Sequence, residues 1–141
     1  MTSKLVSAMD DIATLWEALT PPSATTRLYR RARNPEHIGH RGFYFTPAAE
    51  TVDEEFGSSF ALVRYTFDGV VRLDLTGEDL ITAPELRANE GSLLSGSIRK
   101  NPAWSAGVRS VTVLGSRIQP TDTGDLDLLI QIVAQCEESD G

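Results

Sequence analysis

Apolar runs of strand length fill the second half of this chain and constrain its fold more than any other feature. Val108–Leu114 and Leu126–Ala134 are rich in Val, Ile and Leu, and polar or turn-forming residues bound them, which is typical of β-strands. Because Leu126–Ala134 is almost continuously apolar, we expect it to be buried on both faces of a sheet. The Gly- and Pro-containing segment 115–124 is predicted to be the loop between these strands.

Two more apolar runs, Phe60–Phe67 and Val70–Leu75, lie on either side of Asp68-Gly69. The pair Asp-Gly favours a two-residue hairpin turn, since it tolerates the positive φ angles that such a turn requires. One long strand with a separate neighbour is the alternative. Both arrangements predict a β-rich second half.

Helical patterns are predicted mainly in the first half. Apolar residues recur at three- and four-residue spacing up to Leu19, and Pro21-Pro22 ends the pattern, so residues 4–20 should form an amphipathic helix. Thr46 followed by Pro47 favours a second helix, ending near Phe56, with Thr46 as its N-cap.

The remaining elements are predicted to be short. Strands are expected at residues 25–30 and 43–45, and two short helices at 84–89 and 93–98 in the otherwise irregular segment 76–103. The 141 residues suffice for one domain with a core. We therefore expect a single α+β domain, with the N-terminal helix and turn in 1–24, the core in 25–135 and a tail in 136–141.

Composition narrows the class of protein. The net charge of −7 argues against general binding to duplex nucleic acid, which normally needs a broad basic face. A single cysteine, Cys136, allows no disulfide within the chain, and no signal peptide or membrane span is recognised. A cytoplasmic location is expected. His37 and His40 beside Glu36 lack the further ligand that a closed metal site needs, so the sequence predicts a solvated loop and no metal.

Positive charge is concentrated in one place. Of the thirteen Lys and Arg residues, five lie in the fifteen residues 27–41, directly before the aromatic segment Phe43-Tyr44-Phe45. Arginine pairs with phosphate oxygens and an aromatic face can cover a flat ring, so this pattern favours an anionic ligand with rings, such as a dinucleotide. A solvated, Arg-rich loop beside an ordinary buried strand is the alternative.

Three segments together resemble the ADP-ribosyltransferase superfamily. Leu28-Tyr29-Arg30 resembles its first-strand motif, in which Arg or His follows an aromatic residue, and Gly42-Phe43-Tyr44-Phe45-Thr46 is similar to its second motif, a strand leading into a helix. The segment 106–111 and the later Asp127-Leu128-Leu129-Ile130 are similar to its last strands. The resemblance covers residues 27–133 except 76–103. It implies a split, mostly antiparallel β core.

The resemblance also implies a ligand and the residues that hold it. NAD would be the co-substrate, with Arg30 and the neighbouring Tyr29 at its ribose and phosphates. Tyr44 would stack on the nicotinamide, and Phe45 and Thr46 belong to the same motif. These five residues form the predicted cofactor-binding set.

An acidic residue near the ribose would stabilise the positive charge that develops when the nicotinamide–ribose bond breaks. The family most often has Glu at this position, whereas this chain offers Asp127 and Asp125, which are one methylene shorter. Glu90 is a further candidate acid. The predicted reaction is ADP-ribosyl transfer to a protein or nucleic-acid target, as in small phage-encoded and toxin members of the superfamily. The alternatives are NAD hydrolysis, as in RES-type toxins, and a non-catalytic acidic protein that binds a partner protein.

Overall fold

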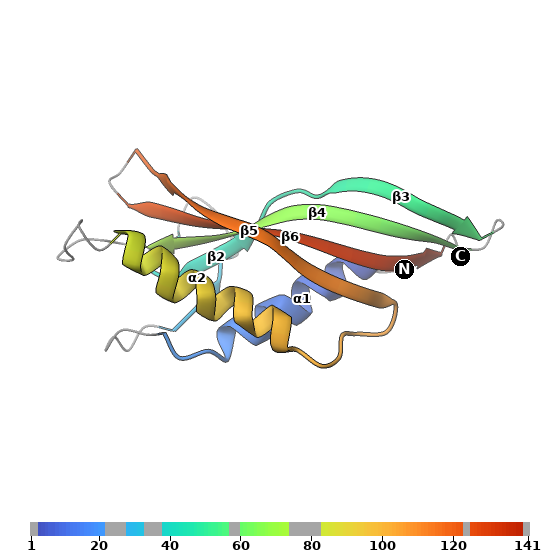
Figure 1. Ribbon diagram of the computed structural model, residues 1–141, viewed down its shortest axis with the longest axis horizontal. Helices are drawn as coiled ribbons and strands as arrows, with labels where there is room; N and C mark the ends of the chain where they lie inside the picture. Colours follow the sequence, from blue (N-terminus) through green and yellow to red (C-terminus); the bar gives the residue numbers. More distant parts are fainter. Residues whose placement is uncertain are drawn as a thin grey trace.

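A single β-sheet with two α-helices on one face makes up the domain (Figure 1). The computed structural model describes residues 3–21, 28–32, 38–56, 60–73, 83–122 and 125–139, with backbone only for Phe56 and residues 83–87. In chain order the elements are α1 (Lys4–Glu17), β1 (Arg30–Arg31), β2 (Gly42–Phe45), β3 (Ala49–Phe56), β4 (Phe60–Leu73), α2 (Ala83–Lys100), β5 (Val108–Pro120) and β6 (Leu126–Ser139). The predicted α+β class is confirmed.

The sheet has six strands in the order β1-β2-β4-β6-β5, with β3 paired to β4 beyond β2. All pairs are antiparallel except β1 with β2. The pairing of β4 with β6 is unbroken from Phe60 opposite Ser139 to Leu73 opposite Leu126. This one continuous sheet differs from the split β core that the resemblance implied.

The N-terminal helix forms where the apolar spacing predicted it. Helix α1 begins after Ser3, whose hydroxyl accepts a hydrogen bond from the Leu5 amide at 3.2 Å, and ends before Ala18. Its buried face carries Ala8, Ile12 and Trp16, which lie four residues apart and therefore share one side of the helix.

Trp16 joins both helices to the sheet. Its indole Nε1 donates a hydrogen bond to the Leu94 carbonyl of α2 at 3.2 Å, and its ring meets Phe43 and Phe45 of β2 at centroid distances of 5.1 and 5.7 Å. Gly69 lies directly beneath it: a Cβ placed on Gly69 would overlap the Trp16 ring atom Cη2. Besides Trp16, the largest fully buried aromatic and aliphatic side chains of the described residues are Tyr29, Phe43, Ile12, Leu73, Leu94, Ile98, Leu128, Ile130 and Ile132.

The predicted hairpin turn at Asp68-Gly69 is wrong, and the alternative of one long strand is confirmed. β4 continues through both residues, with Asp68 opposite Gln131 and Gly69 opposite Ile130. Gly69 serves the packing of Trp16 instead of a turn. No turn forms here because β4 pairs with β6 at fourteen consecutive residues, and this pairing outweighs the preference of Asp68-Gly69 for a turn.

The helix predicted after Thr46 is also wrong, since Ala49–Phe56 forms β3, which pairs with β4. Thr46 does not cap a helix; its hydroxyl accepts a hydrogen bond from the Asp68 amide at 2.8 Å. The acidic residues that follow Val52 lie on an exposed strand, where charge protects an edge from pairing with other chains. The helix prediction depended on Thr46 and Pro47 alone, and these two residues contain no information about the pairing of residues 49–56 with β4.

Four other boundaries differ from the predictions. The two short helices expected in 76–103 are one helix, α2. The loop expected at 115–124 is mostly strand, because β5 extends to Pro120 with a bulge between Val113 and Gly115. The predicted tail is part of β6 as far as Ser139. Of the strand expected at 25–30, residues 25–27 lie outside the described residues, and β1 begins at Arg30.

Burial of the last strand on both faces is confirmed only in part. Leu128, Leu129 and Ile130 are consecutive and all buried, but Gln131 is exposed. In the part of the chain that the structure describes, neither helix has the length and apolar character needed to cross a bilayer.

Replacing Gly69 by Ala tests the seating of Trp16. The added methyl would overlap the indole, and we expect a loss of about 1–3 kcal/mol in the free energy of unfolding, as for overpacked cores. Gly115→Ala is the matched control, because a Cβ there meets no atom within 4 Å. Urea denaturation of both variants measures the difference; equal midpoints would contradict this packing.

Candidate functional site

The two faces of the sheet differ in what covers them. Phe43 and Phe45 point toward Trp16 and the helices, so Tyr44 between them lies on the opposite face, because successive side chains of a strand alternate. We call that side, which carries no helix in the described structure, the outer face (Figure 1). Tyr44 pairs with Val70, and Val70 with Leu129, which gives the outer face a short apolar row.

The next row of the outer face carries charge. Arg30 is exposed and pairs with Gly42, and Arg72 of β4 pairs with Asp127 of β6. The Arg41 amide donates to the Arg72 carbonyl at 2.7 Å, which places Gly42 beside Arg72. The outer face therefore has a second line of side chains that crosses the strands, formed by Arg30, Arg72 and Asp127. It runs beside the line that contains Tyr44.

Asp127 is held by Arg72. The guanidinium donates from Nε to Asp127 Oδ1 at 2.5 Å and from Nη2 to Oδ2 at 3.4 Å, and both side chains are about four-fifths buried, with 20% and 16% exposed. The hydrogen bond with Asp127 raises the pKa of Arg72, although partial burial acts in the opposite direction. The two-pronged contact fixes the orientation of the Asp127 carboxylate.

A shallow hollow adjoins the apolar row. It measures about 200 Å³ and is lined by Gly115, Ser116, Arg117, Leu129 and Gln131. Arg117 keeps 62% of its side chain exposed, with its nearest carboxylate, Asp68, at 3.9 Å. A ligand that lies along this row would therefore find apolar surface with the Arg117 guanidinium at its β5 end and the row of Arg30 and Arg72 beside it.

The other predicted site residues lie elsewhere. Phe45 faces the core and Thr46 closes the end of β2 against Asp68. Asp125 lies in the turn before β6, where its carbonyl accepts from the Thr121 amide at 2.9 Å and from the Thr121 hydroxyl at 3.1 Å. Of the predicted set, the structure brings Arg30, Tyr44 and Asp127 onto one face.

A buried polar cluster that the sequence analysis did not foresee lies beneath the sheet. Tyr29 and Arg41 both contact Glu90 of α2: the tyrosine hydroxyl donates to Glu90 Oε1 at 2.9 Å and Arg41 Nε to the same oxygen at 2.5 Å. All three are at most 1% exposed. Burial, and then the negative charge of Glu90, raise the pKa of Tyr29 far above its usual range, so the hydroxyl stays protonated and donates.

This cluster gives three candidate residues a structural position. Tyr29 of the predicted cofactor-binding set is fully buried and hydrogen-bonded to Glu90. Arg41 was counted in the basic stretch and Glu90 among the candidate acids, yet together they join the start of β2 to α2. Arg41 also has a left-handed backbone with φ of 61°, a conformation that costs an L-residue about 1–2 kcal/mol. Nothing in the sequence indicated that Arg41 and Glu90 form a pair, because they are 49 residues apart and no motif links them.

Ion pairs continue along the outer face beyond the candidate site. Asp53 of β3 accepts from Arg64 and from Gln135, and Arg109 lies 3.8 Å from Glu137. The hydrogen bond with Arg64 lowers the pKa of the exposed Asp53. This part of the outer face is therefore a solvated, charge-paired surface, and the apolar row of Tyr44 stands apart from it.

Neither a known protein-family model nor a curated protein matches this chain.

Removing one partner of the buried cluster should destabilise the fold strongly. Arg41→Met leaves the Glu90 charge buried without its partner, and a loss of about 3–5 kcal/mol in the free energy of unfolding is expected. Arg31→Met is the matched control: Arg31 pairs at the surface with Asp10, and its loss should cost about 1 kcal/mol or less. Chemical denaturation measures both; similar losses would show that the buried pair contributes no more than a surface pair.

Proposed function

We propose that the outer face binds NAD and that the protein is an ADP-ribosyltransferase acting on a protein or nucleic-acid target. The observation that carries the proposal is the arrangement of Arg30, Tyr44 and Asp127, which lie far apart in sequence but occupy adjacent rows of one face. Each was expected, from the resemblance, to contact a different part of the same ligand.

The spacing of the strands suits an extended dinucleotide. Arg30 on β1 and Asp127 on β6 are separated by three strand-to-strand steps, which is roughly 14 Å between backbones at about 4.8 Å a step. Arg30 would bind the phosphates by charge-assisted hydrogen bonds, and the ring of Tyr44 would cover the nicotinamide.

Asp127 would act on the ribose. Breaking the nicotinamide–ribose bond leaves positive charge on the sugar, and a fixed carboxylate lowers the energy of that state. Arg72 would serve as a positioning residue, because its two contacts fix the carboxylate before the ligand arrives. The nucleophile of the target would enter from the open side of the sheet.

A second candidate function is a non-catalytic acidic binding protein. The observation that favours it is the pairing of Asp127 with Arg72, which partly neutralises the carboxylate. The net charge of −7 would favour a basic partner. In this case NAD would be bound without cleavage, or not at all.

Incubating the pure protein with NAD labelled in its ADP-ribose portion, with and without cell lysate, separates these functions. Label transferred to a macromolecule is the expected result, and free ADP-ribose would indicate hydrolysis instead. Intact NAD that titration calorimetry shows to be bound would support the non-catalytic function. Intact and unbound NAD would overturn the proposal.

Two variants test the roles of the residues. Arg30→Ala should raise the Kd for NAD at least about tenfold, since it removes a charge-assisted hydrogen bond, and should change stability by no more than about 0.5 kcal/mol. Arg64→Ala is the matched control, because it removes the same charge from the ion-paired part of the outer face.

Asp127→Asn should slow cleavage about a hundredfold or more while binding persists. Arg72→Met, which keeps the carboxylate, should slow it less. Undiminished cleavage by Asp127→Asn would exclude Asp127 as the acid, and Asp125→Asn would then be tested.

A further inference from the structure

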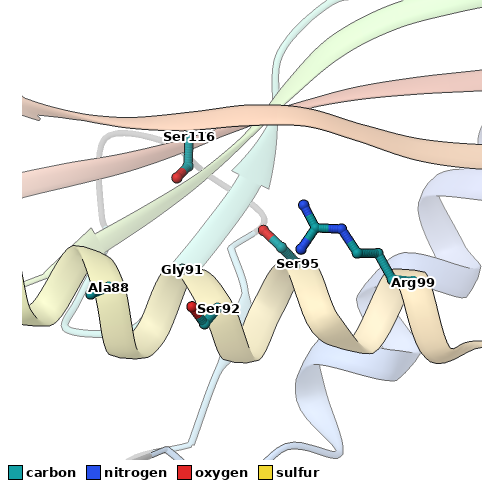
Figure 2. A pocket seen from close by; sticks show the side chains of 6 residues that line it. All are labelled: Ala88, Gly91, Ser92, Ser95, Arg99 and Ser116. Carbon is teal, nitrogen blue, oxygen red and sulfur yellow. The ribbon is translucent and has the colours of Figure 1, made fainter.

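A polar cleft lies on the other side of the sheet, between α2 and β5 (Figure 2). It measures about 320 Å³, and it is lined by Ala88, Gly91, Ser92, Ser95 and Arg99 of α2 and by Ser116 of β5. The helical residues recur at intervals of three and four, so they share one face of α2. That face carries small and hydroxylated side chains where a helix packed on a sheet would usually carry large apolar ones.

Small residues leave the cleft open. A Cβ on Gly91 would lie 3.7 Å from the Ser116 hydroxyl and 3.9 Å from Leu128 Cδ1. Helix and strand therefore come close at Gly91, and a larger side chain there would fill the space between them.

Ser95 shows that the cleft is more than a packing gap. The residue is 5% exposed, and its hydroxyl points from α2 toward β5 in Figure 2. Among the described residues it makes no hydrogen bond. The Ser95 oxygen is not among the buried polar atoms that lack a partner, so it opens onto the cleft, where a polar occupant can form a hydrogen bond with it.

Arg99 supplies charge at one end of the cleft. Arg99 lines the cleft one helical turn beyond Ser95, and its guanidinium forms no ion pair with a described residue. Lys100, although adjacent in sequence, is not one of the described residues that line the cleft, and none of those residues is acidic. Glu90, the acid nearest in sequence, is buried against Tyr29 and Arg41.

We propose that the α2–β5 cleft binds a small phosphorylated sugar. Arg99 holds the phosphate, for which a guanidinium has matching geometry, and the hydroxyls of Ser92, Ser95 and Ser116 bind the hydroxyl groups of the sugar. The volume lies at the lower end of the range for small-molecule sites. The cleft faces the helices and the proposed NAD site lies on the outer face, so the two proposals stand independently.

The test uses the full chain labelled with ¹⁵N and three probes: ribose 5-phosphate, inorganic phosphate and ribose. Ribose 5-phosphate should shift the amide resonances of Gly91, Ser92, Ser95 and Ser116, with inorganic phosphate weaker and ribose weakest. A wild-type protein whose cleft amides respond to neither phosphate probe would overturn the proposal. Equal affinity for ribose and ribose 5-phosphate would overturn the role of Arg99.

Two substitutions with the same change in charge sharpen the test. Arg99→Ala should raise the Kd for ribose 5-phosphate at least about tenfold, as expected for loss of a hydrogen bond to a charged group, whereas Lys100→Ala should change it less than about twofold. Ser95→Ala should weaken binding several-fold. Equal effects of Arg99→Ala and Lys100→Ala would show general charge attraction and contradict a built site.

Discussion

The contact between Trp16 and Gly69 organises the domain. The indole occupies the space that a side chain at position 69 would fill, and from there it reaches the Leu94 carbonyl and the ring of Phe43. One side chain thereby fixes the positions of α1, α2, β2 and β4 relative to one another. Because protein interiors are close-packed, a change in this contact is transmitted to all four elements. The absence of a Cβ at Gly69, in one of the two longest strands, is thus as important to the fold as the apolar residues around it.

The continuous pairing of β4 with β6 determines which chemistry is available on each face. A shift of one residue would exchange the inner and outer side chains of one strand relative to the other. If β6 shifted, for example, Asp127 would enter the core and Leu128 would leave it. With the observed register, polar residues are divided into three groups with different roles. The buried Glu90 cluster joins α2 to the sheet, the outer face presents Arg30, Tyr44 and Asp127, and the cleft gathers hydroxyls around Arg99.

The five arginines of the basic stretch illustrate why local composition overstates a site. Arg41 is buried in an ion pair, and Arg31 pairs with Asp10 while its guanidinium lies 5.3 Å from the centre of the Phe45 ring. Arg30 remains exposed on the outer face, and Arg27 and Arg33 lie outside the described residues. Arginines that are clustered in the sequence are therefore separated in the structure, because side chains alternate between the two faces of β1 and because Arg41 lies in the turn before β2. Composition alone reveals neither effect.

The α+β class, the N-terminal helix, the strand at Phe43–Phe45 and the cores of β5 and β6 could be predicted from the sequence, because they depend on periodicity and apolar content within short windows. Motifs also identified Arg30, Tyr44 and Asp127 as candidates. Three features became clear from the folded structure alone: residues 49–56 are a strand, Asp68-Gly69 is not a turn, and Glu90 is a buried partner of Arg41. In each case the deciding contact comes from another element: the neighbouring β4 for β3, Trp16 of α1 for Gly69, and Arg41, just before β2, for Glu90 of α2. Local preferences of a few tenths to about 1 kcal/mol per residue yield to such contacts, since a paired strand or a filled core contributes far more.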